Sequence, residues 1–79
     1  MSEAVLGEVR QTVADVFFVD AGQVTNESTP ESIPAWDSIG HLNLILALEQ
    51  RFGLTFEPEQ FPQLTSVQAI AAAVSAKNG

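Results

Sequence analysis

The stretch AWDSIGHLNLILALEQRFG, residues 35–53, begins with an acid and a hydroxyl and continues with more apolar residues than one buried helix face needs. Its apolar side chains recur at steps of three and four, which is the spacing of an amphipathic α-helix. Asp and Ser are favoured at helix N-caps, and Gly often follows the last helical residue. The stretch therefore predicts a helix from about Ser38 to Phe52 that stops at Gly53.

The apolar residues of this predicted helix separate into two groups when they are placed around the helix axis. The first group forms a core stripe and consists of Leu44, Ile45, Leu48 and Phe52. The second lies on a face that also carries Glu49 and consists of Ile39, Leu42 and Leu46. A second apolar group with a polar rim predicts an exposed docking surface. A bundle that packs on this helix from two sides would bury the group instead.

Asp37 and Ser38 stand together at the start of this helix, and each is a good N-cap residue. One cap is enough to satisfy the first amides of a helix, so one of the two residues remains to be explained. If Asp37 caps, Ser38 becomes the first helical residue, and its hydroxyl points outward at the positive end of the helix dipole. An attached phosphodiester would be stabilised there, so the position suits a phosphorylated hydroxyl.

Two further long helices are predicted on either side of this stretch. The first covers roughly residues 3–18 and should end near Gly22. The last should open at a capping box formed by Thr65 and Gln68 and run to about Ala76. Their apolar stripes consist of Leu6, Val9, Val13, Val16 and Phe17 in the first helix and Val67, Ile70, Ala71 and Val74 in the last.

The segments between these helices are rich in proline. Two prolines in TNESTPESIPAW predict a long ordered loop before the middle helix, because proline interrupts helices. FEPEQFP predicts one short helical turn, with Pro58 at its first position and Pro62 as its end. The predicted fold class is all-α: a four-helix bundle with three long helices and one short one. With 79 residues, we expect residues 1–79 to form a single domain.

Composition and charge exclude several classes of function. A chain of this length has little room for a deep active-site cleft, which favours a small carrier or binding module over an enzyme. The formal net charge of −7 repels phosphate backbones and anionic lipids, so we expect no nucleic-acid or membrane partner and a preference for basic protein surfaces. The absence of cysteine leaves no disulfide, zinc-thiolate site or nucleophilic thiol, and no metal ligands are predicted.

The N-terminal residues MSEAVLGEVR lack the basic and then apolar layout of a signal peptide. The longest apolar run, LILAL, is too short to cross a bilayer. These two observations predict a cytoplasmic location.

AWDSIGHLNLILALEQRFGLTF, together with the helix before it and LTSVQAIAAAV after it, resembles the acyl carrier protein family over nearly the whole chain. Asp37, Ser38 and Ile39 occupy the Asp-Ser-Leu signature of that family, with Ile in place of Leu. The resemblance implies that Ser38 is esterified by a 4′-phosphopantetheine arm from coenzyme A, beside Asp37. A separate magnesium-dependent phosphopantetheinyl transferase would install the arm, whose thiol carries acyl groups as thioesters. The resemblance also implies that the protein itself catalyses nothing.

Partner recognition in the acyl carrier family is attributed to the second helix. Its apolar positions match the group defined above, Ile39, Leu42 and Leu46, with Glu49 among the flanking acids. The implied partners are acyl-loading and acyl-processing enzymes of a fatty acid or polyketide pathway, with basic or apolar docking patches, and we expect a monomeric carrier. This sequence departs from the family at positions that are usually acidic, which here hold Gly40, Asn43, Gln50 and Arg51. The electrostatic part of docking should therefore be weaker or differently aimed.

Other functions remain compatible with the sequence. An aminoacyl or peptidyl carrier also contains the Asp-Ser-Ile triplet, although the paired glycines that usually precede it are replaced by Pro34, Ala35 and Trp36. An unmodified helical adaptor could use the exposed apolar group only to bind a partner. A nucleophilic Ser38 activated by His41 is disfavoured, because no third residue, oxyanion hole or substrate pocket is predicted.

Overall fold

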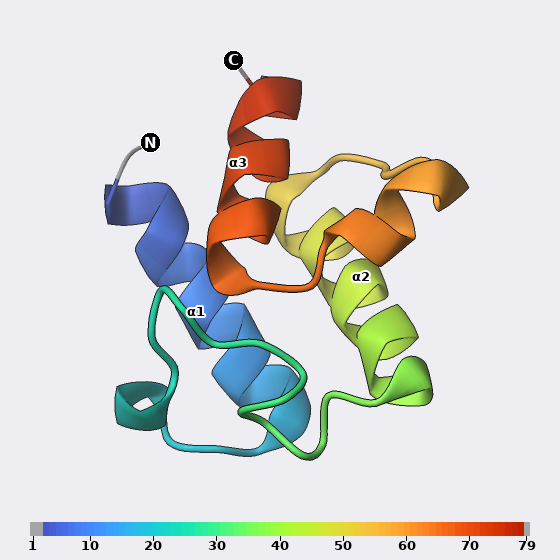
Figure 1. The fold of residues 1–79 in the computed structure, drawn as a ribbon. Coiled ribbons are helices and arrows are strands. Elements are labelled where there is room, and N and C mark those ends of the chain that lie inside the picture. Colours follow the sequence, from blue (N-terminus) through green and yellow to red (C-terminus); the bar gives the residue numbers. More distant parts are fainter. Residues whose placement is uncertain (1–2, 79) are drawn as a thin grey trace.

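The computed structural model describes residues 3–78, and the described residues form helices and connecting segments without a strand. In chain order, the elements are α1 (Glu3–Phe17), the 3₁₀-helix η1 (Ala21–Gln23), α2 (Ser38–Phe52), the 3₁₀-helix η2 (Pro58–Gln63) and α3 (Val67–Asn78) (Figure 1). The predicted all-α class, with three long helices and a short one at η2, is confirmed. The single turn η1 was not predicted. Within residues 3–78, no helix combines the length and hydropathy of a membrane span.

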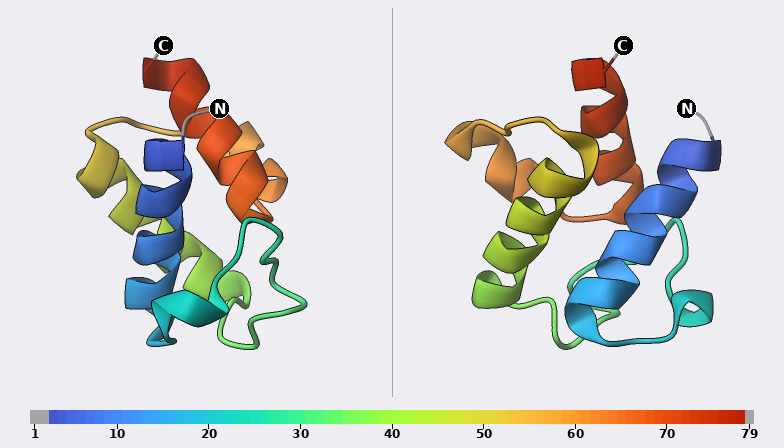
Figure 2. Two further views of the ribbon diagram at one scale, coloured as in Figure 1. Left: turned by 90° about the vertical axis from the view of Figure 1, so that its left-hand side faces the viewer. Right: turned by 180° about the vertical axis from the view of Figure 1, so that it is seen from behind.

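Helix α1 packs against both α2 and α3, and these two run in the opposite direction to α1 (Figures 1 and 2). As a result, the C-terminus of α1 and the N-terminus of α2 lie at the same end of the bundle, as the right-hand view of Figure 2 shows. The long segment between η1 and α2 connects these two helix ends. The end of α1 therefore lies in space near Ser38, the first residue of α2.

The apolar core draws on all three long helices and on the connecting segments. Its buried members are Val9, Val13, Ala14 and Phe17 of α1, Leu44, Ile45 and Leu48 of α2, Val67, Ile70, Ala71 and Val74 of α3, and Val24, Ile33, Trp36, Phe56 and Leu64 between the helices. The predicted stripes are confirmed, except that Leu6, Val16 and Phe52 are only partly buried at the edge of the core. The helical periodicity thus identified most of the core.

Helix α1 matches the predicted range of roughly residues 3–18 to within one residue, but it does not extend toward Gly22. The helix stops at Phe17, and Phe18 takes the left-handed conformation at φ 56°, while the Val19 amide donates to the Ala14 carbonyl at 3.1 Å. This is the Schellman arrangement, in which a left-handed residue follows the last helical one. The prediction that the helix ends near Gly22 is wrong, because Gly22 lies in the separate turn η1.

The start of α3 differs from the prediction by one residue. The Ala69 amide donates to the Ser66 hydroxyl at 3.0 Å, and the Ile70 amide donates to the Ser66 carbonyl, so Ser66 is the capping residue and the predicted Thr65 and Gln68 capping box is wrong. A start at Ser66 leaves the Val67 amide free to donate to the carbonyl of Ser28 in the long loop, at 3.1 Å. The helix therefore begins at the cap, Ser66 rather than Thr65, that goes with a hydrogen bond between α3 and the loop.

The short helix η2 begins at Pro58 as predicted but continues one residue beyond Pro62, to Gln63. A capping box between Glu57 and Gln60 closes its first turn. Because proline lacks an amide hydrogen, Pro62 removes only one donor from this six-residue element and does not end it.

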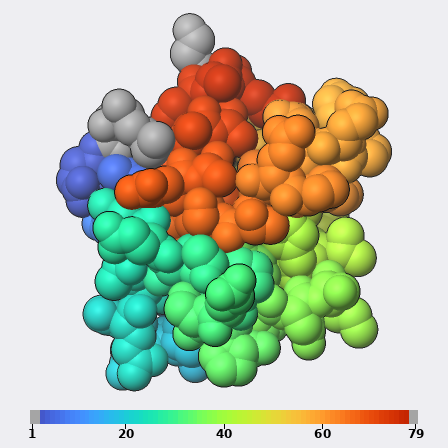
Figure 3. All heavy atoms as spheres, in the orientation of Figure 1, coloured from blue at the N-terminus to red at the C-terminus, as the bar shows by residue number. Residues whose placement is uncertain are grey.

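The loop before α2 is ordered by its own hydrogen bonds and by burial. The buried Ser28 hydroxyl accepts from the Thr25 amide at 2.8 Å, and Trp36 is buried against Phe17 with ring centroids 5.7 Å apart. The space-filling view shows this loop spread over one face of the molecule, directly below the start of α3 (Figure 3). The predicted ordered loop is confirmed, and Trp36 anchors it to the bundle.

Candidate functional site

The N-terminus of α2 has a well-defined cap. Asp37 is extended, at φ −95° and ψ −168°, and its carboxylate accepts a hydrogen bond from the Gly40 amide at 2.8 Å. Its carbonyl accepts from the His41 amide at 2.7 Å. Ser38 is consequently the first helical residue, and it is exposed. The interpretation that Asp37 caps and leaves the Ser38 hydroxyl outside the capping pattern is confirmed.

The electrostatic environment of Ser38 follows from this cap. The Asp37 side chain satisfies the third amide of the helix, whereas the amides of Ser38 and Ile39 have no acceptor among the described residues. Unsatisfied first-turn amides carry the partial positive charge of a helix N-terminus. An anionic group attached to the Ser38 oxygen would lie next to that charge, which is the arrangement in which helices bind phosphates.

Gly40 allows the chain to pack closely around this turn. A Cβ atom at Gly40 would lie 2.4 Å from the Ala35 carbonyl oxygen and 2.8 Å from the Phe17 ring. Any side chain here would therefore push the loop and the end of α1 away from α2. Packing accounts for glycine at a position where acyl carriers usually have an acid.

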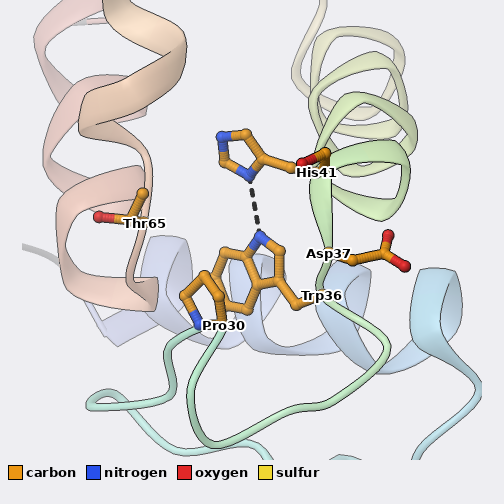
Figure 4. Close-up of a pocket in the computed structure, with 6 residues that line it drawn as sticks. Pro30, Trp36, Asp37, His41 and Thr65 are labelled. Atoms are coloured by element: carbon orange, nitrogen blue, oxygen red, sulfur yellow. Dashed lines mark hydrogen bonds between the residues drawn. The ribbon is translucent and has the colours of Figure 1, made fainter.

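An open pocket of about 320 Å³ lies beside Ser38, between the first turns of α2, the loop and the segment before α3. Its lining consists of Pro30, Trp36, Asp37, Ser38, His41 and Thr65 (Figure 4). In this view, the Asp37 carboxylate points away from Trp36 and His41. The structure thus joins the proposed attachment residue to a small cavity whose Thr65 comes from a distant part of the chain.

His41 links three segments through both of its ring nitrogens. The indole nitrogen of Trp36 donates to Nδ1 at 2.8 Å, and Nε2 lies 2.7 Å from the Phe61 carbonyl oxygen. Because an indole only donates, Nδ1 must accept, and Nε2 then carries the hydrogen that it donates to Phe61. Neither nitrogen is available to take a proton from Ser38. His41 instead clamps the loop and η2 onto α2, a contact that no local sequence pattern indicated.

The predicted exposed group on α2 lies in solvent. Ile39, Leu42 and Leu46 are 73%, 51% and 58% exposed, so no second element within residues 3–78 covers them. We refer to these three residues as the α2 patch. Glu49, predicted beside it, is half-buried, and its carboxylate accepts from the Phe56 amide at 2.8 Å. That carboxylate therefore also holds the segment that follows α2.

Sequence reasoning missed one exposed residue near this site. Phe18, directly after α1, is 94% exposed and lines a second pocket of about 300 Å³ together with Asp37 and Ile39. The only signal in the sequence was the lack of a glycine immediately after Phe17, where a helix C-terminus often has one.

The site as a whole suits a covalently attached phosphodiester, because an exposed hydroxyl stands at the positive end of a 15-residue helix, beside an open pocket. Residues 7–74 match the family model described as phosphopantetheine attachment site, which is most of the chain. This family is defined by its 4′-phosphopantetheine prosthetic group, which is therefore the cofactor of this protein. Its members generally serve as non-catalytic carriers. The chain belongs to the phosphopantetheine attachment site family of carrier proteins.

Proposed function

We propose that this protein is an acyl carrier protein and that Ser38 is the residue that bears its 4′-phosphopantetheine arm. The observation that carries this proposal is the exposed Ser38 hydroxyl at the first position of α2, next to a cap that Asp37 already provides. A serine that served only to cap the helix would have its hydroxyl on a backbone amide, as Ser66 does at the start of α3. The Ser38 oxygen is left for another use.

The residues around Ser38 have separate tasks in this proposal. Asp37 fixes the first turn, and the amides of Ser38 and Ile39 stabilise the negative charge of a phosphodiester on the Ser38 oxygen. During loading, a base of the transferase would take the Ser38 proton, the Ser38 oxygen would bond to the phosphorus that carries pantetheine, and the pyrophosphate P–O bond would break to release 3′,5′-ADP. The bound arm supplies a thiol for acyl thioesters, and a chain without cysteine has no competing thiol of its own.

The surroundings of the site favour an acyl carrier over an aminoacyl or peptidyl carrier. The residues before Asp37 are Pro34, Ala35 and Trp36 rather than paired glycines, and Trp36 is buried in the core with its indole nitrogen bonded to His41. The segment before the attachment residue is therefore held by a large side chain. We propose that residues 1–79 act as a carrier domain, as a cytoplasmic monomer, in a fatty acid or polyketide pathway.

The α2 patch is the proposed contact for acyl-loading and acyl-processing enzymes, with Glu49 on its rim. Exposed apolar residues in a continuous group typically mark interaction sites. Arg51, on the same helix, is paired with Glu8 at 2.8 Å and with Asp15 at 3.6 Å, so its charge is partly compensated within the protein. The partners therefore need apolar or basic surfaces opposite the patch.

Intact-protein mass spectrometry tests the attachment site. Wild type, Ser38→Ala and Ser32→Ala are each incubated with coenzyme A, magnesium and a broad-specificity phosphopantetheinyl transferase. Wild type and Ser32→Ala should gain one phosphopantetheine, because Ser32 is an exposed loop serine away from the helix terminus. Ser38→Ala should gain none.

Loss of folding cannot account for that result. Replacing a true N-cap costs about 0.5–2 kcal/mol, and Ser38 is not the cap, so the circular dichroism and melting midpoint of Ser38→Ala should remain close to wild type. An unmodified wild type would favour an adaptor without a prosthetic group. Continued modification of Ser38→Ala would place the arm on another residue.

A further inference from the structure

Phe18 occupies a backbone conformation that favours glycine. Two of the long helices end in the same left-handed geometry: α2 uses Gly53 at φ 63°, and α1 uses Phe18 at φ 56°. A Cβ atom disfavours this conformation, so phenylalanine is a poor local choice there. Its ring is also 94% exposed and contributes almost nothing to the core. Neither helix termination nor packing explains this side chain.

The position of Phe18 relates it to the attachment site. Phe18 from the end of α1 and Asp37, Ile39 and Gly40 from the start of α2 line one pocket of about 300 Å³. Asp37 and Ile39 are the direct neighbours of Ser38 in the chain. An enzyme whose reacting groups reach the Ser38 oxygen therefore comes directly beside this surface. Enzymes that act on the thiol work at the far end of the arm and need not do so.

The negative charges around this pocket indicate what kind of surface can bind there. Asp37 lines the pocket, Asp20 lies two residues beyond Phe18, and neither forms an ion pair among the described residues. The three basic side chains are engaged elsewhere: Arg10 with Glu3, Arg51 with two acids, and Lys77 over a ring. A second copy would oppose the same acids, and an anionic membrane would be repelled. A cationic protein surface is the complementary occupant.

Building on the proposed attachment at Ser38, we propose that Phe18 is an aromatic anchor for the phosphopantetheinyl transferase. The transferase inserts an apolar side chain into the pocket between Phe18 and Ile39 and places Lys or Arg opposite Asp37. Aromatic side chains, phenylalanine included, are enriched in protein interfaces, and the residues that dominate binding cluster in well-packed pockets. The carrier thus contacts the transferase through the end of α1 as well as through α2.

Steady-state kinetics of loading test this proposal. A broad-specificity phosphopantetheinyl transferase loads wild type, Phe18→Gly, Phe18→Asn and Phe18→Tyr with coenzyme A. Phe18→Gly and Phe18→Asn should raise KM about tenfold with little change in kcat, because they remove a docking contact and leave Ser38 in place. Phe18→Tyr keeps the ring and should stay within about twofold of wild type. The melting midpoint of Phe18→Gly should equal or exceed that of wild type, since glycine suits the left-handed position.

Two variants that each remove one negative charge test the proposed contact between Asp37 and a basic residue of the transferase. Asp37→Asn keeps a side chain that caps helices but removes the charge, so KM should rise. Glu27→Gln removes one charge from the exposed loop, outside the pocket lining, and should leave KM unchanged.

The outcomes separate this inference from the proposed function. Wild-type KM in both Phe18→Gly and Phe18→Asn would overturn the anchor while leaving Ser38 as the attachment residue. Loading of Ser38→Ala, or no loading of wild type, would overturn both proposals. Dimerisation in analytical ultracentrifugation, or binding to vesicles of anionic phospholipid, that depends on Phe18 would assign the surface to a second copy or to lipid and contradict the transferase.

Discussion

The two apolar faces of α2 have similar chemistry and opposite environments. Leu44, Ile45 and Leu48 are at most 2% exposed, whereas each residue of the α2 patch is more than half exposed. Both sets repeat with helical spacing, so propensity and hydrophobicity do not distinguish them. The difference is that the core packs against the first face, whereas no element in the described part of the chain covers the second. One stripe is enough to hold the helix, and the other remains in solvent.

The largest expected effect comes from the buried face. Leu44 is fully buried in the core cluster, and Leu44→Ala leaves a cavity there. Truncating a buried leucine to alanine costs about 2–5 kcal/mol, which is a large part of the about 5–15 kcal/mol that stabilises typical domains. Urea unfolding followed by circular dichroism measures this loss. A decrease below about 1 kcal/mol would mean that Leu44 lies outside the well-packed core.

An intermediate effect is expected at His41, whose ring joins the loop and η2 to α2. His41→Ala leaves the indole N–H of the buried Trp36 without its acceptor and the Phe61 carbonyl without its donor. An unsatisfied buried donor costs about 1–3 kcal/mol. Urea unfolding measures the change in free energy.

A double-mutant cycle separates the loss of the hydrogen bond between Trp36 and His41 from the other effects of His41→Ala. Trp36→Phe removes the indole N–H and keeps an aromatic ring, so Trp36→Phe and His41→Ala together should destabilise less than the sum of the single changes. Additive effects would show that the hydrogen bond between the two side chains contributes little.

The sequence predicted what local rules determine. A cap at Asp37 or Ser38, the stop at Gly53 and both apolar faces of α2 follow from neighbouring residues and helical periodicity, and the structure has all of them, with Asp37 as the cap. The choice of Ser66 over Thr65 as the α3 cap was missed, because two adjacent hydroxyl residues satisfy the same local rule. The hydrogen bond that goes with Ser66 joins α3 to Ser28 in the loop, which is distant in the sequence, so local rules do not include it.

The candidate site shows the same limit. Ser38 and Asp37 were found because they share one helix terminus, whereas the clamp from His41 to Phe61 joins residues 20 positions apart. Phe18 was missed because its place beside the start of α2 depends on which helix ends meet. Only the antiparallel packing of α1 and α2 brings it to the pocket that Ile39 lines.

The smallest effect on stability is expected on the exposed face, where it separates docking from folding most clearly. Leu46 is 58% exposed, so Leu46→Gln removes little buried surface and should change the free energy of unfolding by less than about 0.5 kcal/mol. The proposed docking role of the α2 patch predicts that loading of the holo-protein by its cognate acyltransferase nevertheless slows. Leu44→Ala, assayed below its unfolding transition, is the matched control: it should lose stability and keep its loading rate. If Leu46→Gln loses stability as Leu44→Ala does, both faces of α2 support the fold, and the distinction between them fails.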